Sequence, residues 1–436
     1  MRISIIGSGY VGTTVAACFA DLGHDVVNID IDESVVETIN AGEAPIHEEG
    51  LSELIAEHAG PDGTGRLRAT TDYAAVLDTD VTFLCLPTPQ NNDGSIDLSI
   101  MEAGASQLGE ALAAKEDWHT VVVKSTVVPG STADTITPIL ERESGKTAGE
   151  EFGVGMNPEF LREGTAVHDF LNPDKVVLGA DDDRALEDMR AVFDPLIEAA
   201  DAPVVETNTR TAEMIKYANN GFLAAKISLI NDIGNICKEH SIDAYEVVDA
   251  IGLDDRISDQ FLQSGVGWGG SCFPKDVAAI IAAAEETGYE PAVLNAAVEV
   301  NDRQPERLVA LLAEQLEDEF EGTEIAVLGL AFKPGTDDMR NSRAIPVIDD
   351  LQERGATVTA YDPVATDNAP NYIDDVTYAD SAAAALDGAD GAVVVTDWDE
   401  FAALDAEFDA METAIVVDGR RIIERRDGIT YEGLTW

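Results

Sequence analysis

A glycine-rich turn near the start of the chain constrains the fold more than any other feature. The turn, GSGYVG at residues 7–12, follows a short apolar segment, Arg2 to Ile6, and precedes a helix-compatible run from Thr13 to Leu22. A second apolar segment, Val26 to Ile29, ends at Asp30, about 20 residues past the glycines. Glycines allow a tight turn close to a pyrophosphate, and a carboxylate at Asp30 can accept hydrogen bonds from ribose hydroxyls. The pattern therefore predicts a dinucleotide-binding Rossmann unit that prefers NAD to NADP.

Further strands are predicted in the first half of the chain, at Val81 to Cys85, Thr120 to Lys124 and Phe152 to Met156. Polar side chains follow each of them, and open α/β sheets bind ligands at these strand ends. The polar groups are Thr88, Ser125, Thr126 and the segment Asn157 to Glu163. Two simpler interpretations stay open: Ser125 and Thr126 could cap a helix, and Glu159 and Glu163, four residues apart, could share one face of a surface helix.

The middle of the chain predicts a long, mostly apolar helix from about Arg210 to His240. Lys216 and Asn220 lie four residues apart in it and therefore point the same way. Burying these two side chains without polar partners would cost free energy, so we expect them either to be exposed or to line a polar pocket. The helix is a candidate dimerisation surface, and a purely internal connector is the alternative.

The last third predicts a second doubly wound sheet without a glycine fingerprint. Its strands are expected at Ile325 to Leu328, Thr357 to Tyr361, Gly391 to Val395 and Ala414 to Val417, with a helix from Ala344 to Arg354. Before it, one helix is expected from Val293 to Gln304, with Pro305 opening another. The predicted fold class is α/β, with two Rossmann-like parallel-sheet domains joined by a long central helix and a helical domain. The expected domains are residues 1–200, 201–305 and 306–436.

The charge of the chain is extreme. Its 27 Lys and Arg residues face 84 Asp and Glu residues, for a formal net charge of −57. Such a surface repels nucleic acid and anionic lipid, and no apolar run reaches the ~18 residues of a spanning helix. Because the acidic residues are spread along the whole chain, we expect a cytoplasmic protein of a high-salt organism, where molar salt shortens the Debye length to ~3 Å. A mesophilic protein of unusually low pI is the alternative.

One cysteine stands in a chemically distinctive segment. Cys18, Cys85 and Cys237 lie far apart without metal-ligand spacing, which indicates reduced structural residues and no metal site. Cys272 lies instead between Gly269-Gly270 and the Lys275-Asp276 pair. A thiolate can capture an aldehyde, carry it through a second oxidation and be released by hydrolysis. Together with the dinucleotide turn, this segment predicts an NAD-linked, four-electron oxidation.

Several blocks of sequence, in order, resemble the UDP-glucose/GDP-mannose dehydrogenase family over nearly the whole chain. They are GSGYVG at the start, PTPQNNDGSIDLS from Pro87, KSTVVPGS from Lys124, NPEFLREG from Asn157, Lys216 with Asn220, GVGWGGSCFPKD from Gly265, LGLAFKPGTDDMRNS from Leu328, and DGRR from Asp418. The AFKPGTDDMR block resembles the UDP-glucose branch more closely than the UDP-N-acetylmannosamine branch.

The resemblance implies an NAD-dependent, two-step oxidation of UDP-glucose to UDP-glucuronate for glycan biosynthesis, by a homodimer or higher oligomer. It implies that Cys272 forms a thiohemiacetal and then a thioester, that Glu159 is the acid/base of hydrolysis, that Asp276 and Thr126 position water, and that Lys216 with Asn220 stabilises an oxyanion. The implied cofactor contacts are Gly7, Gly9, Tyr10, Val11, Gly12, Asp30, Thr88, Thr126, Glu163, Lys275 and Arg340. The implied substrate contacts are Glu159, Phe160, Leu161, Arg162, Lys216, Asn220, Arg256, Phe261, Leu262, Gln263, Ser264, Gly265, Gly269, Phe332, Lys333 and Arg420.

Other activities remain open at this point. A UDP-hexosamine dehydrogenase would use the same residues on a different sugar. A hydroxyacid or phosphogluconate-type dehydrogenase shares the Rossmann start and the Lys/Asn helix but has no use for Cys272. A non-catalytic NAD sensor would use Cys272 as a redox switch.

Overall fold

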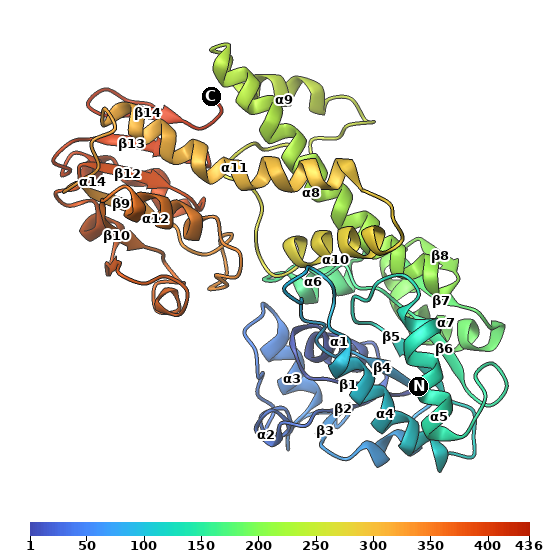
Figure 1. The fold of residues 1–436 in the computed structure, drawn as a ribbon. Coiled ribbons are helices and arrows are strands. Elements are labelled where there is room, and N and C mark those ends of the chain that lie inside the picture. The colour runs from blue at the N-terminus through green and yellow to red at the C-terminus, as the bar shows by residue number, and fades with distance from the viewer. The chain divides into compact units, whose positions relative to one another are not determined.

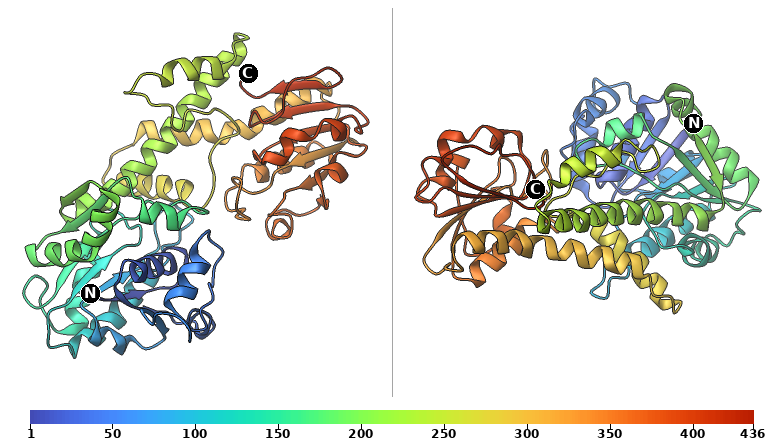
Figure 2. Two further views of the ribbon diagram at one scale, coloured as in Figure 1. Left: turned by 180° about the vertical axis from the view of Figure 1, so that it is seen from behind. Right: turned by 90° about the horizontal axis from the view of Figure 1, so that it is seen from above.

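The computed structural model describes all of residues 1–436, in two structural units, Met1–Asn219 and Asn220–Trp436. Each unit contains a mostly or wholly parallel β-sheet with helices packed against it (Figure 1, Figure 2). The predicted α/β class with two Rossmann-like sheets is confirmed, whereas the boundaries of the three expected domains remain a prediction. None of the helices combines the length and the apolar character that crossing a membrane requires.

The sheet of the first unit has the strand order β3-β2-β1-β4-β5-β6-β7-β8 and is parallel except for the pairing of β6 with β7. Successive residues of a strand enter different clusters of buried side chains: Ile5 and Phe83 lie in one, and Ile6 and Leu84 in another. Because both faces of the sheet are buried, its central strands are continuous runs of apolar residues. The strands are β1 (Arg2–Ile6), β2 (Asp25–Ile29), β3 (Leu67–Thr70), β4 (Val81–Leu84), β5 (Thr120–Val123), β6 (Gly153–Met156), β7 (Val176–Ala180) and β8 (Val204–Thr207).

The helices of the first unit connect these strands. They are α1 (Tyr10–Asp21), α2 (Glu33–Asn40), α3 (Leu51–His58), η1 (Tyr73–Asp78), α4 (Ser99–Ala113), η2 (Thr132–Ile136), α5 (Thr137–Ser144), α6 (Ala166–Leu171) and α7 (Asp183–Ala200). The helix α1 starts in the turn directly after β1, so its N-terminus lies at the carboxyl end of the sheet.

The second unit repeats the strand arrangement of a Rossmann sheet, with the order β11-β10-β9-β12-β13-β14, all parallel. The strands are β9 (Glu324–Leu328), β10 (Thr357–Tyr361), β11 (Thr377–Tyr378), β12 (Gly391–Val394), β13 (Ile415–Asp418) and β14 (Thr430–Gly433). Smaller helices surround them: α12 (Ala344–Glu353), η3 (Ala369–Asn371), α13 (Ala382–Leu386), η4 (Asp399–Ala403) and α14 (Asp405–Phe408).

Four helices precede this sheet: α8 (Thr209–Glu239), α9 (Ala244–Gly252), α10 (Phe273–Glu286) and α11 (Ala292–Gln315). The predicted long helix is therefore present as α8, which crosses from the first unit into the second. Within the second unit α8 and α11 cross (Figure 1), and Ser228 Oγ donates to Ala297 O at 2.7 Å. Ser228, one of the few polar residues of α8, therefore joins this helix to α11.

Two expectations about helices are wrong. Residues 157–165 form an irregular segment, so Glu159 and Glu163 do not share a helical face. Gly164 has a φ of +85°, which a helix does not permit. Pro305 does not open a new helix but lies inside α11, where burial of residues such as Leu308 and Leu312 outweighs the loss of one N–H donor.

Candidate active site

The turn between β1 and α1 is shaped to receive a pyrophosphate. Gly7 has a φ of +100°, and a Cβ on it would meet the carbonyl oxygen of Cys85. A Cβ on Gly12 would meet the carbonyl oxygen of Gly7. With Tyr10 as the first residue of α1, backbone N–H groups and the positive end of the helix dipole lie at this turn. Side chains at Gly7 and Gly12 would therefore clash with the backbone of this turn.

Asp30 directly follows β2 and is half-buried. One of its carboxylate oxygens accepts Ser8 N–H at 2.6 Å and the other accepts Asp32 N–H at 3.0 Å. A carboxylate has about four acceptor positions, so Asp30 keeps some for a ribose. The residues of this turn therefore fit NAD.

A buried ion pair lies beyond the carboxyl ends of β5 and β6. Lys216 Nζ, on α8, lies 2.7 Å from Glu159 Oε1, and Glu159 Oε2 accepts Leu161 N–H at 2.6 Å. The side chains are only 4% and 9% exposed, respectively. Burial raises the pKa of Glu159, but the charge and hydrogen bond of Lys216 outweigh it and hold that pKa below its usual value. The predicted acid/base and oxyanion residues of the first unit are thus direct partners.

A second buried lysine lies beside this pair. Lys124, at the end of β5, donates to Asn157 Oδ1 at 2.6 Å, and Asn157 Nδ2 donates to Val177 O at 2.8 Å. Burial lowers the pKa of Lys124 to about 8, with Glu159 and Lys216 both close enough to influence it. The sequence placed Asn157 only among the polar residues that follow the strand and indicated no role for Lys124, although a lysine at the end of an apolar strand in so acidic a chain is a usable signal.

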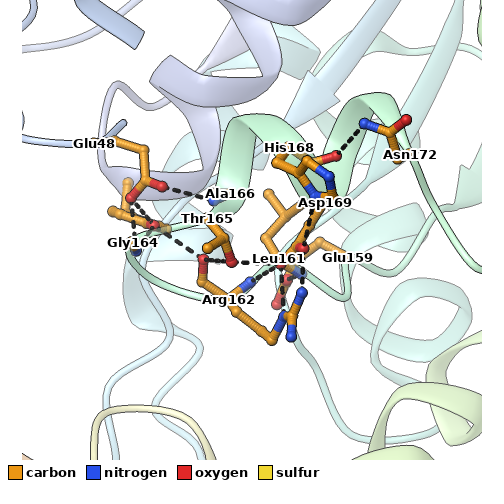
Figure 3. Close-up of polar contacts among 11 residues, drawn as sticks. Glu48, Glu159, Leu161, Arg162, Gly164, Thr165, Ala166, His168, Asp169 and Asn172 are labelled. Carbon is orange, nitrogen blue, oxygen red and sulfur yellow. Dashed lines mark hydrogen bonds and ion pairs between the residues drawn. The ribbon is translucent and has the colours of Figure 1, made fainter. Parts of the chain in front are cut away.

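The segment that follows Glu159 is held by its own side chains (Figure 3). The Arg162 guanidinium binds Asp169 with contacts of 2.6 and 2.9 Å, so this predicted substrate residue is committed to an ion pair. Lys175 Nζ lies 4.0 Å from the centroid of the Phe160 ring, and Lys216 Nζ lies 5.6 Å from the same centroid. Phe160 and Arg162, two of the predicted substrate residues, are therefore each held by charged side chains of this unit.

The hydroxyl residues after β4 and β5 do not cap helices. Thr88 Oγ1 donates to Thr126 O at 3.0 Å, and Ser125 Oγ donates to Leu86 O at 2.6 Å. These bonds hold the two loops together at the strand ends. The alternative of a helix cap is wrong for Ser125 and Thr126, since α5 begins at Thr137 and η2 at Thr132.

In the second unit Cys272 is the N-cap residue of α10 and is exposed, whereas Cys18, Cys85 and Cys237 are buried. Burial raises the pKa of the Cys18 thiol and that of Cys85, the latter to about 12, so neither is a nucleophile. A helix N-terminus stabilises a thiolate. This favourable setting for Cys272 was not predicted, because it depends on where α10 begins.

Asp276, one turn into α10, is the centre of a polar cluster. It is buried, accepts Asn220 Nδ2 at 2.7 Å through one oxygen, and binds Lys275 Nζ at 2.7 Å through the other. Its own N–H donates to Cys272 O at 2.9 Å. The second unit therefore brings together the predicted residues Asn220, Cys272, Lys275 and Asp276.

Three buried amide side chains hold the glycine-rich segment before Cys272. Asn301 Oδ1 accepts Trp268 N–H at 2.7 Å and its Nδ2 donates to Trp268 O at 3.0 Å. Asn231 Oδ1 accepts Gly265 N–H at 2.8 Å, and Gln304 Nε2 donates to Gly265 O at 2.8 Å. These side chains of α8 and α11 fix the backbone that leads to the thiol, and no sequence motif indicated them apart from their polarity in apolar helices.

The other predicted substrate and cofactor contacts are distributed over the second unit. Arg256 is exposed and pairs with Asp254 at 2.6 Å, and Arg340 binds Asp338 at 2.7 Å. Arg420 Nε donates to Val395 O at 2.8 Å. Phe261 and Gln263 are exposed, Leu262, Ser264, Gly265 and Gly269 are buried or nearly so, and Phe332 and Lys333 are half-buried. Their contacts with ligands, like those of Val11 and Gly9, stay predictions.

Comparison with known proteins agrees with this geometry. Three domains of the UDP-glucose/GDP-mannose dehydrogenase family match the chain: the NAD binding domain at residues 1–197, the central domain at 210–303 and the UDP binding domain at 326–425.

The chain is 62% identical to the UDP-glucose 6-dehydrogenase AglM of Haloferax volcanii over 435 residues, which is all of both chains. The structure of a UDP-glucose dehydrogenase from Pyrobaculum islandicum matches with a TM-score of 0.91 and 42% identity, covering 100% of this chain and 98% of that one. A UDP-D-ManNAc dehydrogenase from Pyrococcus horikoshii matches with a TM-score of 0.85 and 29% identity, covering 100% and 99%. The protein therefore belongs to the UDP-glucose/GDP-mannose dehydrogenase family.

Proposed function

We propose that the protein is a UDP-glucose 6-dehydrogenase, which oxidises C6 of UDP-glucose to the carboxylate of UDP-glucuronate with two NAD+. The observation that carries the proposal is the exposed Cys272 at the N-cap of α10, one turn before the buried Asp276. A nucleophilic thiol is needed only if an aldehyde is retained for a second oxidation. Identity of 62% to a relative of that name, against 29% to the UDP-D-ManNAc dehydrogenase, supports glucose as the sugar.

The chain's own residues account for the steps. NAD+, when bound at the turn of residues 7–12, would accept a hydride from C6 in each oxidation, and the proton of the C6 hydroxyl is released each time. The Cys272 thiolate adds to the C6 aldehyde, forming a carbon–sulfur bond while the aldehyde oxygen gains a proton. The second oxidation converts this thiohemiacetal into a thioester. Water then attacks the thioester carbonyl and the carbon–sulfur bond breaks, which yields the carboxylate, the free Cys272 thiol and one proton.

Charged side chains assist these steps. The Lys216 ammonium stabilises negative charge on the C6 oxygen, a task for which a buried cation is effective. Glu159, with a pKa held below its usual value, is ionised at neutral pH and can accept a proton from water. Asp276, oriented by Asn220 and Lys275, positions water for hydrolysis. In this proposal the uridine diphosphate lies mainly against the last third of the chain, at Phe332, Lys333 and Arg420 in the matched UDP binding domain. The loop at 256–265, in the matched central domain, is a further substrate contact.

The test is the yield of NADH per UDP-glucose consumed, at about 2 M salt, with UDP-N-acetylmannosamine in parallel. Two NADH from UDP-glucose and none from the acetamido sugar would support the proposal. One NADH would mean that the aldehyde escapes and that Cys272 has no covalent role. Turnover of the acetamido sugar alone would keep the mechanism and change the substrate.

We also propose that two copies pair through α8. Phe222, Leu229 and Ile236 are 72%, 62% and 55% exposed and recur every seven residues, which places them on one face of this helix. An exposed apolar row of this kind is typical of a protein interface. Light scattering at high salt should give the mass of a dimer for the wild type and of a monomer for Leu229→Lys. A monomeric wild type would contradict the pairing.

The acidic surface supports a setting in the cytoplasm of a halophilic organism, as does the similarity to the protein from halophilic Haloferax volcanii. At low salt the repulsion among carboxylates is no longer screened. Dialysis into dilute buffer should therefore abolish activity and unfold the chain, as followed by circular dichroism. Retention of both would count against this setting.

A further inference from the structure

The carboxylate of Glu48 joins two parts of the first unit that are far apart in the sequence. Glu48 lies in the loop between α2 and α3 and is buried. Its Oε1 accepts Ala166 N–H at 2.6 Å, and its Oε2 accepts Gly164 N–H at 2.9 Å (Figure 3). The Tyr10 hydroxyl donates to the same Oε2. One carboxylate thus binds both the first residue of α1 and the end of the segment 157–164.

Glu48 does more here than cap a helix. The N-cap residue of α6, Thr165, makes no capping hydrogen bond, and its hydroxyl points instead to Asp169 Oδ2 at 3.1 Å. Glu48 supplies the missing acceptor to Ala166, the first residue of that helix. The further bonds to Gly164 and Tyr10 lie outside α6 and would not be needed for capping alone.

The groups that Glu48 holds belong to the two functional segments of this unit. Tyr10 is part of the NAD-binding turn. Gly164 ends the segment that begins with Asn157 and contains Glu159. Gly164 N–H also donates to the Tyr10 hydroxyl at 3.1 Å, so Tyr10, Glu48 and Gly164 form a closed triangle of hydrogen bonds. These hydrogen bonds therefore link the turn directly to the acid/base segment.

We propose that Glu48 is a positioning residue that couples the NAD-binding turn at Tyr10 to the acid/base segment 157–164. Its carboxylate keeps the turn and the segment in one arrangement, so that NAD binds beside an already ordered Glu159. The effect on turnover rests on the proposed function, whereas the effect on NAD+ binding can be measured without any sugar.

The test is Glu48→Gln, with Glu49→Gln as the matched control. Glutamine keeps the size of the side chain but turns an NH2 group toward one of the backbone N–H groups, so that one anchor is lost. Glu49 is adjacent to Glu48 in the sequence and is exposed, and its substitution by glutamine removes the same charge. For Glu48→Gln we expect the Kd of NAD+ to rise about tenfold and kcat to fall about tenfold. The Kd of UDP should stay unchanged, because its binding domain matches residues 326–425. The control should behave as wild type.

Other results would overturn the coupling. It fails if NAD+ binding and kcat of Glu48→Gln both stay within about twofold of wild type, or if only one of them changes. An equal loss of UDP affinity would indicate general damage and also overturn it. If wild type itself does not oxidise UDP-glucose, the proposed function fails, and the NAD+ measurement still decides whether Glu48 orders the turn.

Tyr10→Phe keeps the proposal testable if Glu48→Gln does not fold. It removes only the phenolic O–H and leaves both backbone bonds of Glu48 in place. We expect NAD+ affinity and kcat each to fall about threefold. Where the double variant folds, its losses should be smaller than the product of the single losses, because the two side chains act as one unit. Unchanged NAD+ binding in Tyr10→Phe, or independent effects in the double variant, would refute the coupling.

Discussion

Replacing Lys216 by methionine should destabilise the protein in a way that depends on pH. The Lys216 ammonium lies 2.7 Å from Glu159, and the two side chains are 4% and 9% exposed. Methionine fills a similar volume but leaves the Glu159 carboxylate buried without its cation. Breaking a buried pair in this way costs about 3–5 kcal/mol of stability at neutral pH. The same change at an exposed pair costs about 1 kcal/mol or less.

The sign of the pH dependence follows from the pKa of Glu159. In wild type Lys216 holds that pKa below its usual value, so the pair contributes stability above the pKa of an unfolded glutamate and loses it as the pH falls through the folded pKa. In Lys216→Met burial is left to raise the pKa of Glu159, and the folded variant binds a proton that the unfolded chain releases. The difference in stability between wild type and variant should therefore be largest near neutral pH, decrease as the pH falls, and become small only below the folded pKa of Glu159 in wild type, which lies under the usual value of about 4.5.

The assay is urea-induced unfolding in about 2 M salt, between about pH 3 and 7.5, so that the range includes values below the usual pKa of a glutamate. Arg210→Met is the matched control, because Arg210 also lies on α8 and pairs with Asp134 at 2.6 Å while both side chains are more than half exposed. Adding Glu159→Gln to Lys216→Met should recover part of the loss, since no unpaired charge then remains. A loss equal to that of the control, or one that does not vary with pH, would refute the reasoning.

Three further predictions concern single side chains. Cys272→Ser should keep binding NAD+ and UDP but stop after partial oxidation; two NADH per sugar in that variant would remove the covalent step. Asp276→Asn should slow hydrolysis about 10²-fold or more and accumulate the thioester, seen by mass spectrometry of the intact chain; an unchanged rate would exclude Asp276. His119 has its pKa lowered to about 3 by burial, so it is neutral when folded, and stability should fall by up to about 5 kcal/mol as the pH drops from about 6.5 to 3. His119→Gln should flatten this acid-side loss in urea titrations, and an identical pH profile would contradict the assignment.

The sequence predicted those parts of the site that local patterns encode. The turn at Gly7, the carboxylate at Asp30 and the long helix with Lys216 all lie where periodicity and spacing placed them. The short strands β3, β7, β8, β11 and β14 were not predicted. Two of these lack the continuous apolar run of a central strand, because β3 has an exposed residue between two buried ones and no residue of β8 is fully buried.

The contacts that orient the site were harder to predict because they join distant residues. Glu48 binds Gly164 across a separation of 116 residues, and Asn301, on α11, binds Trp268 in the segment before α10. The position of the Glu48 carboxylate or of the Asn301 amide in the sequence does not indicate which residue it binds. A charge or amide within an apolar context, as at Lys124 or Asn231, signals only that some polar partner exists. Its identity comes from the folded chain.

Only the first of the two sheets is suited to a dinucleotide, although both begin alike. Gly7 after β1 and Gly329 after β9 have φ values of +100° and +92°, and a carboxylate follows the next strand in each sheet, Asp30 and Asp362. Asp30 accepts two backbone N–H groups, whereas the buried Asp362 accepts four and also the indole N–H of Trp398 at 3.0 Å. Asp362 therefore has no acceptor position left for a ribose. Nor does a helix begin directly after the turn at Gly329, so no helix N-terminus is offered to a pyrophosphate. The same strand order thus serves two ligands, because local hydrogen bonding uses up the carboxylate in one sheet and leaves it available in the other.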